Sequence, residues 1–178
     1  MKAFKEYIIP FVGLKLGVHQ FNYEINNDFL ALFDFEEYNS TNVNVELEFN
    51  KKTTFFELKF KVDGVVNVNC DVTTEAFDLP IKNELFLVVK FGEEFNDENE
   101  EVLIIEHGSY EVNVSQYIYE CIVLGVPSKR VHPGVEDGTL KSEILEKLES
   151  LAPKEEKKIN EEDIDPRWNK LKSLLKDK

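Results

Sequence analysis

The chain has 178 residues and a formal net charge of −14, from 35 acidic and 21 basic side chains. A chain of this length suits one domain with a short appendage, and it can bury enough apolar surface to fold without disulfides or a metal ion. The negative charge repels phosphate backbones, so direct binding of free nucleic acid is disfavoured.

The N-terminal part predicts strands at residues 11–16 and 20–25, followed by a helical spacing of Phe29, Leu30 and Phe33. The first residues, MKAFKEYIIPFVGLKLG, are interrupted too often by charge to form a secretory leader. No stretch approaches the roughly 18 apolar residues of a membrane span. We therefore expect a cytoplasmic protein without membrane contact.

Regular alternation of apolar and polar residues predicts a run of strands in the next part of the chain. Residues 43–49, VNVELEF, alternate with the period of a half-buried strand, and the alternation resumes at 56–62 after a turn at NKKT. Asp63 and Gly64 then predict a tight hairpin turn, because both residues tolerate positive φ. A third strand is expected at 66–72, which completes a meander.

Two further strands are predicted before the helices begin. Residues 83–91, NELFLVVKF, form a nearly continuous apolar run that predicts burial on both faces, and residues 102–106, VLIIE, predict another strand. The acid-rich residues 93–101 between them predict either a solvated loop or a surface for a basic partner. The expected fold is α+β, with a strand-rich antiparallel sheet or partly closed barrel and short helices.

The period changes to that of a helix near residues 114–124. Asn113 and Gln116 are typical of a capping box at its start. A second helix is predicted near 139–151. The expected organisation is therefore a single strand-rich domain over residues 1–152.

The C-terminal part is predicted to leave that domain. Residues 153–164 predict a charged linker, and residues 165–178 predict a helix with Pro166 in its first turn. Trp168 belongs to an apolar stripe on this helix, and Arg167 is one of several basic residues beside it. A helix this short is marginal alone, so we expect it to dock either on its own body or on a partner.

The chain carries no motif of a metal, nucleotide or hydrolase site. Its three histidines are scattered, and its two cysteines, Cys70 and Cys121, lack the closely spaced partners that zinc requires. Phosphate-binding, dinucleotide-binding and nucleophile-elbow glycine patterns are absent. Both cysteines are in phase with apolar positions, which predicts free, buried thiols of raised pKa and low reactivity. We expect no catalytic residue, no cofactor and no metal.

The segment PSKRVHP is the compact basic patch of the body and contains Lys129, Arg130 and His132. Its side chains could bind phosphate or an acidic protein surface, or its charge could offset the dipole at a helix C-terminus. Both interpretations remain open. Together with Arg167 and Trp168, these three residues are the candidate partner-binding residues.

Several segments resemble those of one protein family. VDGVVNVNCDVTTEAFDLPI is similar to a segment in which a strand leads into Cys-Asp-Arg-Cys-Leu, NVSQYIYECIVLGVP resembles a helix with an apolar-Pro end, and DPRWNKLKSL resembles a C-terminal signature. These are segments of the YceD family, the large ribosomal RNA subunit accumulation proteins. Val72 and Thr73 replace the Arg and the second Cys, so the chain resembles a Bacteroidetes-like variant that lacks the cysteine pairs and any metal site built on them.

The resemblance implies a non-enzymatic role in large-subunit ribosomal RNA accumulation, processing and ribosome assembly. Its implied partner is a basic ribosomal protein or a pre-ribosomal large-subunit particle, which an acidic body would suit. The alternative is a small-molecule carrier with an apolar barrel interior, because alternating strands and aromatic residues also build such a fold. A nuclease acting on ribosomal RNA has no metal motif to support it and is opposed by the net charge.

Overall fold

The computed structural model describes residues 4–152 of the chain. The described residues fall into two units, which divide between Leu140 and Lys141. The linker predicted at 153–164 and the helix predicted at 165–178 lie outside the described residues. The predicted domain boundaries therefore stay predictions.

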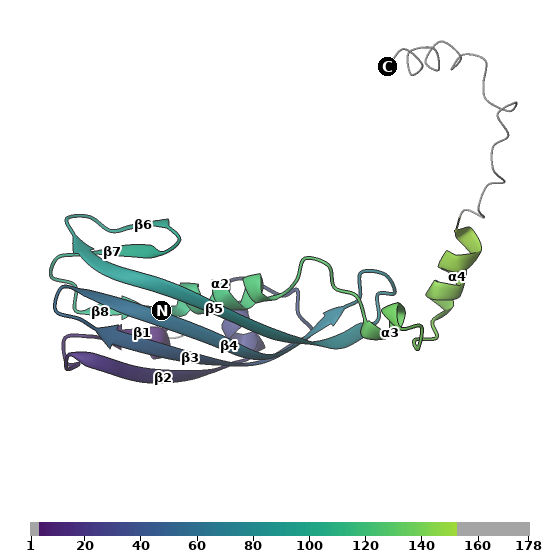
Figure 1. Ribbon diagram of the computed structural model, residues 1–178, viewed down its shortest axis with the longest axis horizontal. Helices are drawn as coiled ribbons and strands as arrows, with labels where there is room; N and C mark the ends of the chain where they lie inside the picture. The colour runs from purple at the N-terminus through teal and green to yellow at the C-terminus, as the bar shows by residue number, and fades with distance from the viewer. Residues whose placement is uncertain (1–3, 153–178) are drawn as a thin grey trace, which may run out of the picture. The chain divides into compact units, whose positions relative to one another are not determined.

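The first unit is an α+β fold built on a six-stranded sheet (Figure 1). The strands of the chain are β1 (Ile8–Pro10), β2 (Gly17–Ile25), β3 (Ser40–Lys51), β4 (Phe55–Asn69), β5 (Ala76–Gly92), β6 (Asn96–Asn99), β7 (Val102–Glu106) and β8 (Glu111–Asn113). The sheet has the order β2-β3-β4-β5-β7-β6, in which only β5 and β7 are parallel, while β1 and β8 form a separate antiparallel pair. This confirms the predicted class and the mostly antiparallel sheet.

Short helices accompany the sheet. They are α1 (Asn27–Ala31), α2 (Ser115–Gly125), α3 (Pro133–Glu136) and, in the second unit, α4 (Glu143–Leu151), with a 3₁₀ turn at Lys5–Tyr7. None of the helices between residues 4 and 152 is both long and apolar enough to cross a membrane.

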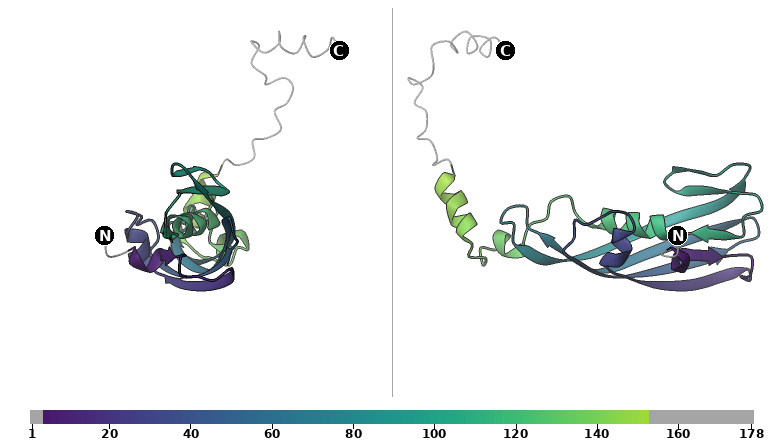
Figure 2. Two further views of the ribbon diagram at one scale, coloured as in Figure 1. Left: turned by 90° about the vertical axis from the view of Figure 1, so that its left-hand side faces the viewer. Right: turned by 180° about the vertical axis from the view of Figure 1, so that it is seen from behind.

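The core lies between the concave face of the sheet and α2, which contacts β4 and β5 (Figure 2). Alternate side chains of β4 are buried there, and Leu58, Phe60 and Val66 are fully enclosed. Ile118 and Ile122 fill the space from the helix side. Burial of this apolar surface, at about 25 cal/mol per Å², is the main stabilising contribution.

The sheet is open and its concave face is filled. Within the described residues, β2 and β6 are the two edges of the sheet and do not pair with each other. Of the two forms predicted, the open sheet is therefore the one found. The carrier hypothesis loses its barrel interior, because packed side chains occupy the space on the concave face.

Gly64 lies in the middle of a strand rather than in a turn. β4 runs through Asp63 and Gly64 without a break and pairs with β3 and β5 on both sides. A Cβ atom at Gly64 would lie 2.5 Å from the carbonyl oxygen of Asn42 and 2.6 Å from the Cα of Val43. Glycine is thus required here by a close backbone approach. The hairpin predicted at this position is wrong, and the strands predicted at its two sides are one strand.

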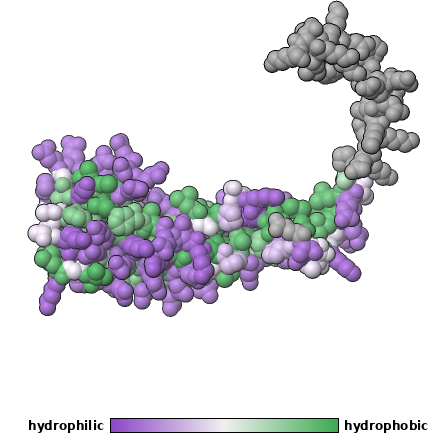
Figure 3. Space-filling view, in the orientation of Figure 1, coloured by the Kyte–Doolittle hydropathy of each residue, from purple (hydrophilic) through white to green (hydrophobic). Residues whose placement is uncertain are grey.

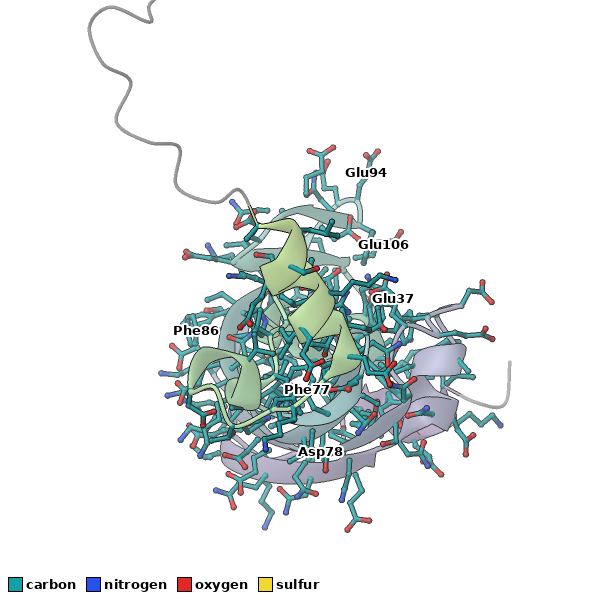
Figure 4. The ribbon with its side chains drawn as sticks, turned by 90° about the vertical axis from the view of Figure 1, so that its right-hand side faces the viewer. Glu37, Phe77, Asp78, Phe86, Glu94 and Glu106 are labelled. Atoms are coloured by element: carbon teal, nitrogen blue, oxygen red, sulfur yellow. The ribbon has the colours of Figure 1, made fainter. Side chains whose placement is uncertain are left out.

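Two other strand predictions need correction. Residues 11–16 are not a strand, because Leu14 N–H donates to the Phe11 carbonyl in a turn, and the N-terminal strand β1 ends at Pro10. β5 includes the apolar run at 83–91, but its convex face meets solvent, where Phe86 is 50% exposed (Figure 4). The predicted burial on both faces is therefore wrong.

The helix boundaries are close to those predicted, whereas the capping differs. The Asn113 side chain accepts the Ser115 N–H at 2.9 Å, but the Gln116 side chain donates to Glu120 at 2.7 Å and does not reach back. The predicted capping box is therefore wrong. α4 begins at Glu143 instead of 139, because the Ser142 hydroxyl caps it.

Candidate functional site

The basic segment after α2 is fastened to the turn between β4 and β5. Arg130 N–H donates to the Asp71 carboxylate at 2.6 Å, and Asp71 N–H donates to the Arg130 carbonyl at 2.7 Å. The Arg130 guanidinium lies 3.7 Å from Asp71 and 3.6 Å from Glu37. Arg130 therefore connects the segment after α2 to the β4–β5 turn and to Glu37, and the carboxylates of Asp71 and Glu37 balance its charge.

Cys70 lies at the centre of this contact and is 1% exposed. Its sulfur accepts the backbone N–H of His132 at 3.3 Å. The His132 ring accepts the N–H of Gly134 at 2.9 Å and so caps α3. The same ring packs edge-to-face with Phe77, with 5.4 Å between the ring centroids. We call Cys70, Asp71, Thr73, Arg130 and His132 the Cys70 junction.

The surroundings of Cys70 favour the thiolate. Burial alone would raise the pKa of the thiol, but hydrogen bonds from the Thr73 side chain and from the backbone N–H groups of His132, Thr73 and Val72 lower this pKa to about 7. Thr73 is itself fully buried. The raised pKa predicted for this residue is wrong, because alternation reveals burial but not the donors around the sulfur, whereas the predicted burial is confirmed and the low reactivity stays a prediction.

Cys121 behaves as the sequence predicts. It lies on the buried side of α2, and burial, followed by the charge of Glu84, raises the pKa of its thiol to about 11. Both thiols are free. Within residues 4–152, no three His, Cys, Asp or Glu side chains come together in an arrangement that could hold a metal ion.

The five candidate partner-binding residues fall into three groups. Arg130 and His132 belong to the Cys70 junction, so their described contacts hold the loop in place. Lys129 is exposed between them and α2. Arg167 and Trp168 lie outside the described residues. The last turn of α2 contains no basic residue, so the basic segment does not lie within that turn.

The acid-rich residues 93–101 are partly a loop and partly the edge strand β6, which covers Asn96–Asn99. β6 pairs antiparallel with β7, and we call residues 93–106 the acidic hairpin. From 91 to 128 the chain has nine acidic residues and no lysine or arginine. None of the nine takes part in a salt bridge within the part of the chain that the structure describes.

The acidic hairpin presents this charge to solvent. Figure 4 shows Glu94 and Glu106 on the hairpin side of the molecule, with Glu94 directed away from the body. Figure 3 shows hydrophilic and hydrophobic residues side by side on the surface at this end of the sheet. Such a surface attracts basic groups and repels phosphate.

Comparison with known proteins gives one family match. The family model described as "Large ribosomal RNA subunit accumulation protein YceD" matches residues 58–175. No curated protein and no solved structure matches the chain. The matched range contains the whole Cys70 junction and the acidic hairpin.

Proposed function

Because the chain belongs to the YceD family, we propose that it is a non-enzymatic cytoplasmic factor that supports large-subunit ribosomal RNA processing and ribosome assembly. The family match over residues 58–175 carries this proposal, since the family is described by large-subunit ribosomal RNA accumulation. The family resemblance noted in the sequence is confirmed by this match.

The charge of the chain supports action through a basic partner. A net charge of −14 opposes direct contact with a phosphate backbone, whereas it accelerates the encounter with a positively charged protein. The acidic hairpin concentrates this charge at one edge of the sheet. We therefore propose that the partner is a basic ribosomal protein, either free or within a pre-ribosomal large-subunit particle.

A deletion strain and a gradient test the proposal. Deletion should lower the ratio of large-subunit to small-subunit ribosomal RNA, and expression of the full chain should restore it. A tagged full chain, purified in gentle salt, should sediment with large-subunit precursors and be released from them as salt is raised, because salt screens the attraction. A normal ratio in the deletion strain, together with absence from particle fractions, would reject the proposal.

A further inference from the structure

Two adjoining hollows follow one side of α2 and share Tyr117 in their walls. The first, of about 330 Å³, lies between the acidic hairpin and the start of the helix, and the second, of about 480 Å³, includes Cys121 and Leu124 towards the end of the helix. Binding sites in proteins commonly have volumes of roughly 300–1,000 Å³. We call the two hollows together the α2 groove.

The α2 groove has an apolar base. Leu103, Ile105 and Val112 line the first hollow and are almost completely buried. Phe95 lines the first hollow and is 58% exposed, and Leu124 lines the second and is 78% exposed. Large apolar side chains are therefore available to a partner in both hollows.

Acidic side chains border this apolar base. The residues that line the groove include six acids and no lysine or arginine: Glu84, Asp97, Glu100, Glu106, Glu111 and Glu120. In the part of the chain that the structure describes, only Glu84 of these six forms a salt bridge, with Lys59 at 3.1 Å. The groove thus combines apolar surface with negative charge that the described residues leave largely unbalanced.

Tyr117 shows that the negative charge acts inside the groove. Burial, followed by the charges of Asp97 and Glu120, raises the pKa of its hydroxyl to about 12. The hydroxyl therefore stays protonated at neutral pH. Its ring offers a face to an aliphatic or cationic side chain, and its hydroxyl can donate or accept a hydrogen bond.

We propose that the α2 groove binds a protein segment in which lysine or arginine residues flank an aliphatic or aromatic anchor. The anchor covers Phe95 in the first hollow or Leu124 in the second, and the cations pair with the bordering carboxylates. A nucleic acid strand would place phosphates beside those carboxylates, and an uncharged apolar ligand would leave them without partners. This inference rests on the proposed function, because it names the surface that receives the basic partner.

A binding assay with synthetic peptides tests the groove. The probe is a short fluorescein-labelled peptide that alternates arginine with leucine, measured by fluorescence anisotropy with the full chain at low salt. A peptide with serine in place of leucine retains the charge and should bind at least about threefold more weakly. Equal binding of the two peptides would overturn the apolar part of the proposal.

Two sets of substitutions locate the binding. The groove variant carries Asp97→Asn, Glu100→Gln and Glu120→Gln, and should bind the peptide at least about tenfold more weakly. The matched control removes the same charge from exposed positions of β2 and β3, with Glu24→Gln, Glu46→Gln and Glu48→Gln, and should lose less than about threefold. Equal losses in the two variants would overturn the proposal, because binding would then follow net charge alone.

The groove and the proposed function can fail separately. If the arginine-leucine peptide does not bind while deletion still lowers large-subunit ribosomal RNA, the groove inference is overturned and the proposed function stands. If the peptide binds in the groove while deletion leaves the ribosomal RNA unchanged, the proposed function fails. In that case the groove remains a site for basic segments of another partner.

Discussion

The Cys70 thiol should make the stability of the fold depend on pH between about 7 and 9. Its pKa falls from an ordinary value of 9.0 to about 7 in the folded chain, so the folded state favours the thiolate. This contribution is fully present above the unfolded pKa and is lost as pH falls through the folded one. At about 1.36 kcal/mol per pKa unit, the shift corresponds to about 2–3 kcal/mol.

Urea unfolding of the reduced protein at several pH values measures this effect. Between pH 7 and 9 the free energy of unfolding of the wild type should rise by about 2 kcal/mol relative to that of Cys70→Ala, which lacks this thiol. Cys121→Ala is the matched control. It should keep the rise and exceed that of the wild type by about 0.4 kcal/mol at pH 9, because the folded-state pKa of Cys121 is raised to about 11 while the unfolded thiol already ionises near its ordinary pKa of 9.0.

Parallel stability curves for the wild type and Cys70→Ala across pH 7–9 would refute the reasoning. The buried tyrosines Tyr23, Tyr38 and Tyr117, whose pKa values burial raises to about 12, are the same in the two proteins, so their effect cancels in the comparison. Loss of the rise in Cys121→Ala would place the titrating thiol at the wrong residue.

Three further substitutions, two of them paired with a control substitution, test the fold and the Cys70 junction by urea unfolding. Gly64→Ala should lower the free energy of unfolding by about 1–3 kcal/mol, because the added Cβ would overlap β3. Gly13→Ala is its control and should be neutral or slightly stabilising, because a Cβ there would have no atom within 4 Å. Equal effects of the two substitutions would contradict the close approach at Gly64. Asp71→Ala should cost about 1–3 kcal/mol, since it removes the acceptor of Arg130 N–H, and no loss would show that the junction is not stabilising. Ile118→Ala should lower the free energy of unfolding by about 2–5 kcal/mol, because Ile118 is fully buried. Leu124 lies on the exposed side of α2, so Leu124→Ala should cost less than about 0.5 kcal/mol. Similar values for the two would contradict the placement of α2.

Features that depend on local periodicity were predictable from the sequence. Strands β3 and β7 and helix α2 have the expected positions, because alternation and helical spacing report which side chains face a core. The Asp63-Gly64 pair misled the prediction, since a turn and a close backbone approach both select glycine. Only pairing with β3 along the strand distinguishes the two.

Features that depend on distant residues were not predictable. The donors around Cys70 include the N–H of His132, which lies far along the chain, so no local sequence pattern connects it to Cys70. The pairing of β1 with β8 and the parallel contact of β5 with β7 likewise join segments by the path of the chain. For the candidate site, the sequence indicated the acidic charge of 93–101 but not the apolar base that β7 and β8 place beside it.

The short strand β6 also has a consequence for self-association. An edge strand exposes unpaired backbone N–H and C=O groups. A strand from a second copy of the chain can pair with these groups, and such pairing is a first step of aggregation. β6 has only four residues, and two of them are Asp97 and Glu98. Two copies meeting at this edge would bring like charges together, so the edge discriminates against its own chain while it stays open to a segment of opposite charge. The same few carboxylates would therefore oppose self-association at this edge and attract the basic partner proposed above.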